Sequence, residues 1–86
     1  MNRQQELLLI LAEEASEVAQ ACSKIQRFGI ENNRGQLVQE LGDFLALLDL
    51  VHQEFAITEE ELKAAYDAKM EKLKTYSNLF DKLDNK

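Results

Sequence analysis

Apolar residues recur three and four positions apart in three stretches of the chain, and this spacing places them on one side of an α-helix. The first stretch predicts a continuous helix from Asn2 to Phe28, which Gly29 would end. Its expected apolar stripe consists of Leu8, Leu11, Ala15, Val18, Cys22 and Ile25. The first third of the chain is therefore predicted to be one long amphipathic helix.

A second helix is predicted from near Arg34 to about Phe55. Just before it, Asn33 can serve as the N-cap and Gln36 as its reciprocal partner. The expected apolar stripe of this helix consists of Leu37, Leu41, Phe44, Leu48, Val51 and Phe55. Two long helices are thus expected to follow one another through a short loop.

The start of a third helix is marked by a capping box, in which Thr58 and Glu61 satisfy each other's backbone donors. Three consecutive acids at this start favour the positive end of the helix. The apolar register continues through Leu62, Tyr66, Lys69, Leu73, Tyr76 and Phe80. Beyond it, the polar tail from Asp81 to Lys86 is expected to fray, and a short fourth helix can form near the C-terminus.

Length and composition favour one small all-α domain. The 86 residues include no proline and three glycines, so little interrupts long helices. We therefore expect residues 1–86 to form a single domain of three main antiparallel helices. Because so short a chain builds only a thin core, a homodimer or homotetramer is expected to complete the bundle.

The chain is acidic, with a formal net charge of −6. An acidic surface disfavours binding to a nucleic acid polymer and to an anionic membrane. The single cysteine excludes an intrachain disulfide and fits a reducing compartment. No apolar run is long enough to cross a membrane, and the N-terminal sequence lacks a secretory pattern, so a cytoplasmic protein is expected.

Two acidic clusters lie within the apolar helical sequence. Glu13, Glu14 and Glu17 form the first cluster, and Glu40 and Asp43 form the second. Positions three apart face the same way on a helix, so Glu14 pairs with Glu17 and Glu40 pairs with Asp43. If these four carboxylates converge, they form a site for Mg²⁺ or Mn²⁺, whereas the absence of Cys and His from the set argues against zinc or copper.

The residues around these acids indicate whether the acids lie on a solvent-exposed face or at the edge of a packed interior. Glu14 falls among apolar or small residues, so it is expected at the edge of a packed interior. Carboxylates at such an edge repel one another and lose hydration, which raises their pKa values unless a cation compensates. The alternative is a structural ionic network, in which the acids pair with basic side chains. The candidates for that pairing are Lys24, Arg27, Lys69 and Lys72.

Other chemistry is poorly supported. The only histidine, His52, does not follow a carboxylate at the spacing used by di-iron bundles, and calcium-loop and phosphate-loop motifs are missing. Cys22 is expected to be a small core residue, and His52 a packed or half-exposed one. Lys69 either snorkels from the edge of the core or faces a substrate phosphate, and Lys24 and Arg27 can serve the same purpose.

The two acidic motifs in this order, on two helices, resemble the MazG-type, all-α nucleoside triphosphate pyrophosphohydrolases. The motifs are Glu-Glu-x-x-Glu, from Glu13 to Glu17, and Glu-x-x-Asp, from Glu40 to Asp43. The similarity extends over roughly residues 5 to 76 and is greatest with small members of the kind often encoded by bacteriophages.

The resemblance implies an enzyme that cleaves a nucleoside triphosphate to the monophosphate and pyrophosphate with Mg²⁺. It implies that Glu14, Glu17, Glu40 and Asp43 bind the metal and that Glu13 positions a water or another group near it. Lys24 and Lys69 then become candidate phosphate contacts, and Arg27 a further one.

The chain departs from the family pattern in the third helix. Leu73 stands near a position where many members have Asn, and Ser77 follows Tyr76 where many continue with Pro. These departures concern the contacts with the nucleotide rather than the metal. Two other functions remain open: a non-catalytic helical interaction module, and a sensor that binds nucleotide or metal without turnover.

Overall fold

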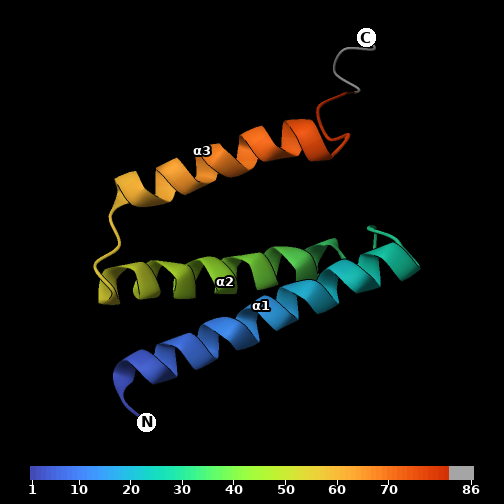
Figure 1. Ribbon diagram of the computed structural model, residues 1–86. Helices are drawn as coiled ribbons and strands as arrows, with labels where there is room; N and C mark the ends of the chain where they lie inside the picture. Colours follow the sequence, from blue (N-terminus) through green and yellow to red (C-terminus); the bar gives the residue numbers. More distant parts are fainter. Residues whose placement is uncertain (82–86) are drawn as a thin grey trace. The chain divides into compact units, whose positions relative to one another are not determined.

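The computed structural model describes residues 1–81, and within that range the protein contains α-helices and no β-strand. The helices are α1 (Arg3–Phe28), α2 (Arg34–Glu54) and α3 (Glu59–Tyr76) (Figure 1). The predicted all-α fold is therefore confirmed. The chain separates into two compact units, Met1–Ala56 and Ile57–Lys86. None of the helices described is long and apolar enough to cross a membrane.

Helix α1 begins and ends at residues whose local chemistry explains both boundaries. Asn2 is its N-cap, and the Asn2 side chain accepts a hydrogen bond from the backbone N–H of Gln5 at 2.8 Å. The Gln5 side chain accepts in return from the Asn2 backbone at 2.9 Å, which completes a capping box that is not among the predicted ones. At the other end, Gly29 has a φ of 93° and donates its N–H to the Ile25 carbonyl, so the predicted stop at Gly29 is confirmed.

The start of α2 differs from the prediction. Asn33 occupies the N-cap position, but its side chain makes no capping hydrogen bond there. The Asn33 amide instead donates to the carbonyl of Gly29 at 2.8 Å, across the turn. Gln36 is therefore not a reciprocal capping partner, and its side chain is available to accept from Lys24. The turn is held by a bond back to the end of α1 rather than by a cap on α2.

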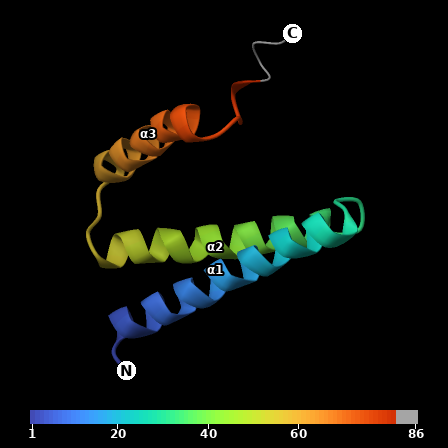
Figure 2. The same cartoon turned by 45° about the vertical axis from the view of Figure 1, so that its right-hand side comes forward.

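Helices α1 and α2 run antiparallel and lie side by side (Figures 1 and 2). One connection lies near each end of this helical hairpin. The Arg3 guanidinium forms a 2.8 Å ion pair with Glu54, which joins the start of α1 to the end of α2. The Lys24 ammonium donates to the Gln36 side chain at 3.4 Å near the turn. The acidic motifs lie between these two connections, at the middle of the hairpin.

The residues of α1 that pack against α2 are not those of the predicted stripe. Leu7 and Ala21 are the buried residues of α1, and Glu14, midway between them, is half-buried. The predicted stripe is split: Leu11, Val18 and Ile25 are half-buried, whereas Leu8, Ala15 and Cys22 are exposed. Helix α1 carries apolar residues on two adjacent sides, so periodicity alone could not determine which side the partner covers.

The second unit contains α3. The predicted capping box is confirmed, because the Thr58 hydroxyl accepts from the Glu61 backbone at 3.1 Å and the Glu61 carboxylate accepts from the Thr58 backbone at 2.8 Å. The pKa of Glu61 is lowered because its carboxylate accepts hydrogen bonds from the Thr58 backbone, which has the larger effect, and from the Thr58 hydroxyl. The predicted register to Phe80 is too long, since α3 ends at Tyr76. There the Ser77 hydroxyl donates to the Leu73 carbonyl at 2.6 Å and competes with the next helical turn.

Helix α3 has no buried residue. Of the apolar residues expected along this helix, Leu73 is half-buried. Tyr66 and Tyr76 are exposed, with exposed fractions of 63% and 83%. Salt bridges of the exposed type, such as Lys63 with Asp67, contribute little to the stability of such a helix. The expected fraying tail and short fourth helix fall mostly on residues 82–86, which lie outside the described part of the chain.

Candidate metal centre

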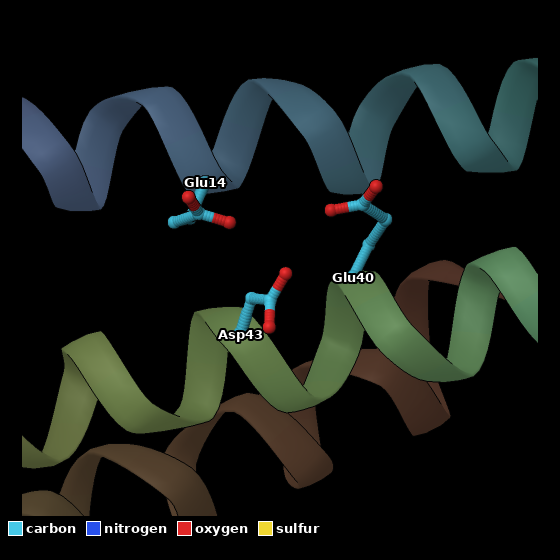
Figure 3. Close-up of side chains that lie close together, drawn as sticks. All are labelled: Glu14, Glu40 and Asp43. Carbon is cyan, nitrogen blue, oxygen red and sulfur yellow. The ribbon is translucent and has the colours of Figure 1, made fainter.

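Three carboxylates meet between the two helices of the hairpin. Glu14 projects from α1 toward α2, while Glu40 and Asp43 project from α2 toward α1 (Figure 3). One oxygen from each carboxylate lies within 4.8 Å of an oxygen of the others. The spacing of Glu40 and Asp43 explains their part of the arrangement, because residues three apart lie one turn apart on one face of α2. We call these three residues the carboxylate cluster.

Helices α1 and α2 pack along a line that we call the seam. The cluster lies where the seam meets solvent. Glu14 and Glu40 are half-buried, and Asp43 is exposed. Loss of hydration raises the pKa of Glu14 above its ordinary value, and the negative charges of Asp43 and then Glu40 raise it further. Glu17 and Glu13 add smaller contributions of the same sign to the pKa of Glu14. The expectation that crowded carboxylates at this edge have raised pKa values is confirmed for Glu14.

The cluster has no basic counter-charge within residues 1–81, where no Lys or Arg forms an ion pair with any of its members. Lys24 bonds to neutral Gln36, and the Arg27 guanidinium lies over the ring of Phe28 at 5.1 Å. The alternative of a structural ionic network therefore finds no support from Lys24 or Arg27. Lys69 and Lys72 belong to the second unit and are exposed there.

The remaining candidate residues lie around the cluster or apart from it. Glu17 and Glu13 are exposed on α1 and are not among the three residues that meet. The negative charges of Glu17 and Glu13 nevertheless raise the pKa of Glu14, so both residues affect the cluster. Lys24 is half-buried and lies two turns beyond Glu17 on the same side of α1. The four carboxylates considered from the sequence thus include all three members of the cluster. The fourth, Glu17, lies near the cluster but is not part of it.

Two expectations about other side chains can also be compared with the structure. Cys22 is exposed, so the expectation of a small core residue is wrong, because the side of α1 that carries Cys22 does not face α2. His52 is half-buried, as expected, and its Nε2 lies 3.3 Å from the carboxylate of Asp49. Gln36 was predicted only as a capping partner, and no pattern in the sequence indicated its contact with Lys24.

The geometry of the cluster suits a hard divalent cation. Oxygens on opposite sides of one Mg²⁺ or Ca²⁺ ion are about 4 to 5 Å apart, since each lies at about 2.0 to 2.6 Å from the metal. The cluster oxygens all lie within 4.8 Å of one another, which is close enough for them to share one ion. An all-oxygen set of donors also excludes a preference for soft metals. The fold and the site thus define an all-helical protein with a carboxylate cluster that could hold a metal ion.

Comparison with known families identifies the protein more closely. The sequence model of the MazG nucleotide pyrophosphohydrolase domain matches residues 2–78. The chain therefore belongs to the MazG nucleotide pyrophosphohydrolase family, and the resemblance found from the acidic motifs is confirmed. No curated protein and no solved structure matches the chain. The family match covers both acidic motifs and continues through α3.

Proposed function

We propose that the protein is a magnesium-dependent nucleoside triphosphate pyrophosphohydrolase. Its substrate is a ribo- or deoxyribonucleoside triphosphate, and its products are the nucleoside monophosphate and pyrophosphate. The observation that carries the proposal is the carboxylate cluster, which lies without a basic partner, within residues 1–81, in a chain of the MazG family. The net charge of −6 is compatible with an anionic substrate once the cluster holds a cation.

The cluster residues Glu14, Glu40 and Asp43, with Glu17 beside them, hold the metal in this proposal. Bound magnesium, or manganese in its place, would neutralise phosphate oxygens and lower the pKa of a water. The water oxygen bonds to the α-phosphorus, the bond from that phosphorus to the bridging oxygen breaks, and pyrophosphate leaves with that oxygen. Glu13, on the exposed side of α1, is proposed to position the water and accept its proton.

Basic side chains are proposed to bind the phosphates. Lys24 is the best placed of them on the hairpin, because Gln36 holds its ammonium across the seam on the same side of α1 as Glu17. Arg27 and Lys69 are further candidates, on the end of α1 and on α3. We further propose that the protein acts in the cytoplasm as a homodimer or homotetramer, and that it binds neither a nucleic acid polymer nor a membrane.

The decisive experiment measures pyrophosphate release from a panel of common and modified nucleoside triphosphates, with and without Mg²⁺. Release that requires Mg²⁺ supports the proposal. Nucleotide or metal binding without product would instead indicate a sensor. If neither metal nor nucleotide raises the melting temperature and no product forms, the protein is an interaction module.

Two matched variants connect the activity to the cluster. Glu14→Gln removes a charged ligand with little change in volume, whereas Glu31→Gln makes the same change at an exposed position in the turn between α1 and α2. Loss of an outer neighbour of a metal ligand commonly costs about 10- to 100-fold in activity, so loss of a ligand should cost at least about 100-fold. Glu31→Gln should leave turnover unchanged. Equal activities of the two variants would contradict the assigned role of the cluster.

A further inference from the structure

One side of the hairpin holds a basic group near the acidic motifs. The Lys24 ammonium donates to the side-chain oxygen of Gln36 at 3.4 Å, which joins α1 to α2. Lys24 is half-buried, and no carboxylate in the part of the chain that the structure describes forms a salt bridge with it. The Gln36 side chain is a neutral acceptor. The ammonium group is therefore held in place while its positive charge is not neutralised.

Helix geometry relates this pair to the carboxylate cluster. Gln36, Glu40 and Asp43 are spaced by four and three residues, so they share one face of α2. Glu40 and Asp43 project from that face toward α1 (Figure 3). Gln36 lies one turn before Glu40, or about 6 Å along the helix axis. The Lys24–Gln36 pair thus lies beside the cluster, on the side toward the turn between the helices.

The other basic residues of the hairpin are placed differently. Arg3 is engaged in its ion pair with the end of α2, and the guanidinium of Arg27 lies over an aromatic ring. Arg34 is exposed two residues before Gln36, so it faces another side of α2. Of the lysines and arginines of the hairpin, Lys24 is therefore the one that is held beside the acidic motifs.

We propose that Lys24 binds the terminal phosphate of the triphosphate and that Gln36 is a positioning residue, which fixes how far the ammonium group lies from the metal. This inference rests on the proposed function and deepens it, because it assigns to this pair the preference for triphosphates over diphosphates. A triphosphate whose α- and β-phosphates lie at the metal extends beyond it by one more phosphate. The turn between Glu40 and Gln36 provides room for that phosphate, and a diphosphate ends before it.

The role of Gln36 follows from the flexibility of a lysine. A free lysine side chain loses conformational freedom when it binds a phosphate, and this loss weakens binding. The hydrogen bond with Gln36 orders the Lys24 side chain before the substrate arrives. A carboxylate at position 36 would also order it, but its charge would neutralise the ammonium group and repel the phosphate. A neutral acceptor is the side chain that orders the lysine and leaves its charge to the substrate.

The test measures binding to the full chain by calorimetry in saturating Mg²⁺. The probes are triphosphates and diphosphates of the four common deoxynucleosides, with a methylene group in place of the α–β bridging oxygen to block cleavage. Lys24→Met should weaken the triphosphates about tenfold and leave the diphosphates unchanged. Gln36→Met keeps the length of the side chain but removes the amide, and it should weaken the triphosphates about threefold, since Lys24 can still reach the phosphate. Equal weakening of triphosphates and diphosphates would overturn the assignment to the terminal phosphate.

Two comparisons isolate the positioning role. Gln26→Met makes the same change at an exposed position two residues beyond Lys24, on the opposite side of α1, and should change neither affinity. In a Lys24→Met protein, Gln36→Met should cause no further loss, because its effect acts through the ammonium group. A further loss there would show that Gln36 contacts the nucleotide itself, and it would overturn the positioning role.

Gln36→Glu separates this role from a merely structural one. A carboxylate holds the Lys24 ammonium more tightly than an amide does, so the melting temperature should not fall. Triphosphate binding should nevertheless weaken at least about tenfold, because the charge of Lys24 is then neutralised. If Gln36→Glu binds triphosphates as well as the unaltered protein does, the proposal is wrong.

The geometry of the pair is also measured without any nucleotide. Reductive methylation with limiting formaldehyde, followed by mass spectrometry, gives the reactivity of each lysine. The Lys24 amine must leave Gln36 in order to react, so Gln36→Met should raise its reactivity about threefold relative to exposed Lys63. Unchanged reactivity would show that Gln36 does not hold Lys24 in solution, and it would overturn the proposal.

Pyrophosphate release from the natural triphosphates is measured on the same proteins. If the analogues bind with a preference that depends on Lys24 and Gln36 but no pyrophosphate is released, the proposed hydrolysis fails and this inference stands. If hydrolysis occurs and the preference for triphosphates is the same in every variant, this inference alone fails. If no analogue binds, both fail.

Discussion

Two regions of the protein each gather three carboxylates, and the two groups differ in what surrounds them. At the start of α3, Glu59, Glu60 and Glu61 occupy the first helical turn. At the seam between α1 and α2, the carboxylate cluster occupies the middle of two helices. The first group faces backbone N–H donors and the positive end of a helix, which stabilise negative charge. The second group faces mainly other carboxylates.

The pKa values express this difference in sign. Hydrogen bonds from Thr58, first from its backbone, lower the pKa of Glu61. Loss of hydration, followed by the charges of Asp43 and Glu40, raises the pKa of Glu14. The acids of α3 are therefore explained by the needs of the helix itself. The negative charge of Glu14 opposes folding, and a bound cation would reverse this effect.

The largest expected effect is on the stability that magnesium confers. At about 100 times its dissociation constant, Mg²⁺ should stabilise the folded protein by about 2.7 kcal/mol. Asp43→Asn should abolish most of this gain, because it removes one of the charged ligands proposed for the metal. Glu60→Gln, which changes the acids of α3 instead, should retain it. Thermal melts of the three proteins in EDTA and in Mg²⁺ measure the difference.

Equal stabilisation of Asp43→Asn and the unaltered protein by Mg²⁺ would show that the carboxylate cluster does not bind the metal. Loss of the gain in Glu60→Gln would show that metal binding depends on the acids of α3. Unfolding of Asp43→Asn without metal would indicate that the cluster is a structural ionic network.

The next effect concerns Lys24, whose ammonium group is a proposed contact for the substrate phosphates. Lys24→Met keeps most of the apolar stem and removes the ammonium that Gln36 holds. Loss of one charge-assisted contact with a phosphate is worth about 1.4 kcal/mol, so KM for the triphosphate should rise about tenfold. Lys63→Met, on α3, removes an exposed lysine that pairs with Asp67 and should leave KM unchanged. Steady-state kinetics with saturating Mg²⁺ would show equal KM values if Lys24 has no role in binding.

A smaller effect is expected at the start of α3. Thr58→Ala removes the hydroxyl that accepts the backbone N–H of Glu61, and loss of an N-cap side chain typically costs about 1 kcal/mol. The cost should be the same with and without Mg²⁺, in contrast to Asp43→Asn. Urea denaturation followed by circular dichroism measures it. A cost that depended on Mg²⁺ would show that the two acidic regions are coupled.

Much of the fold followed from the sequence because its signals are local. The capping box at Thr58 and the stop at Gly29 each depend on a few neighbouring residues, and both were predicted. The capping box at Asn2 uses Gln5 in the same way, and it was overlooked although the signal was present. The turn at Asn33 was predicted wrongly because its side chain had two acceptable partners, and the bond to Gly29 is the one that formed.

The candidate site was harder to predict because it depends on which sides of two helices meet. The motif spacing placed the acids on the helices, and it correctly grouped Glu40 with Asp43. The contact of Lys24 with Gln36 could not be predicted, since it requires the register of α1 against α2. The same uncertainty explains Cys22: helix α1 is apolar on two adjacent sides, and only the packing with α2 shows that Cys22 lies on the uncovered one.

The smallest expected effect is also the most direct test that the charges of the two regions affect stability in opposite directions. The pKa of Glu14 is raised in the folded protein, so its contribution to stability is complete below the unfolded-state pKa and is lost as pH rises through the raised value. The pKa of Glu61 is lowered, so its contribution is present above the unfolded-state pKa and is lost as pH falls through the lowered value. In EDTA at neutral pH, Glu14→Gln should therefore raise the melting temperature and Glu61→Gln should lower it. As pH falls below the ordinary range of a glutamate, both differences should shrink, because the carboxyl groups of the unaltered protein become neutral. Melting curves of the two variants between neutral and acidic pH would contradict the comparison if both shifts had the same sign, since the charge of Glu14 and the charge of Glu61 would then act alike on folding.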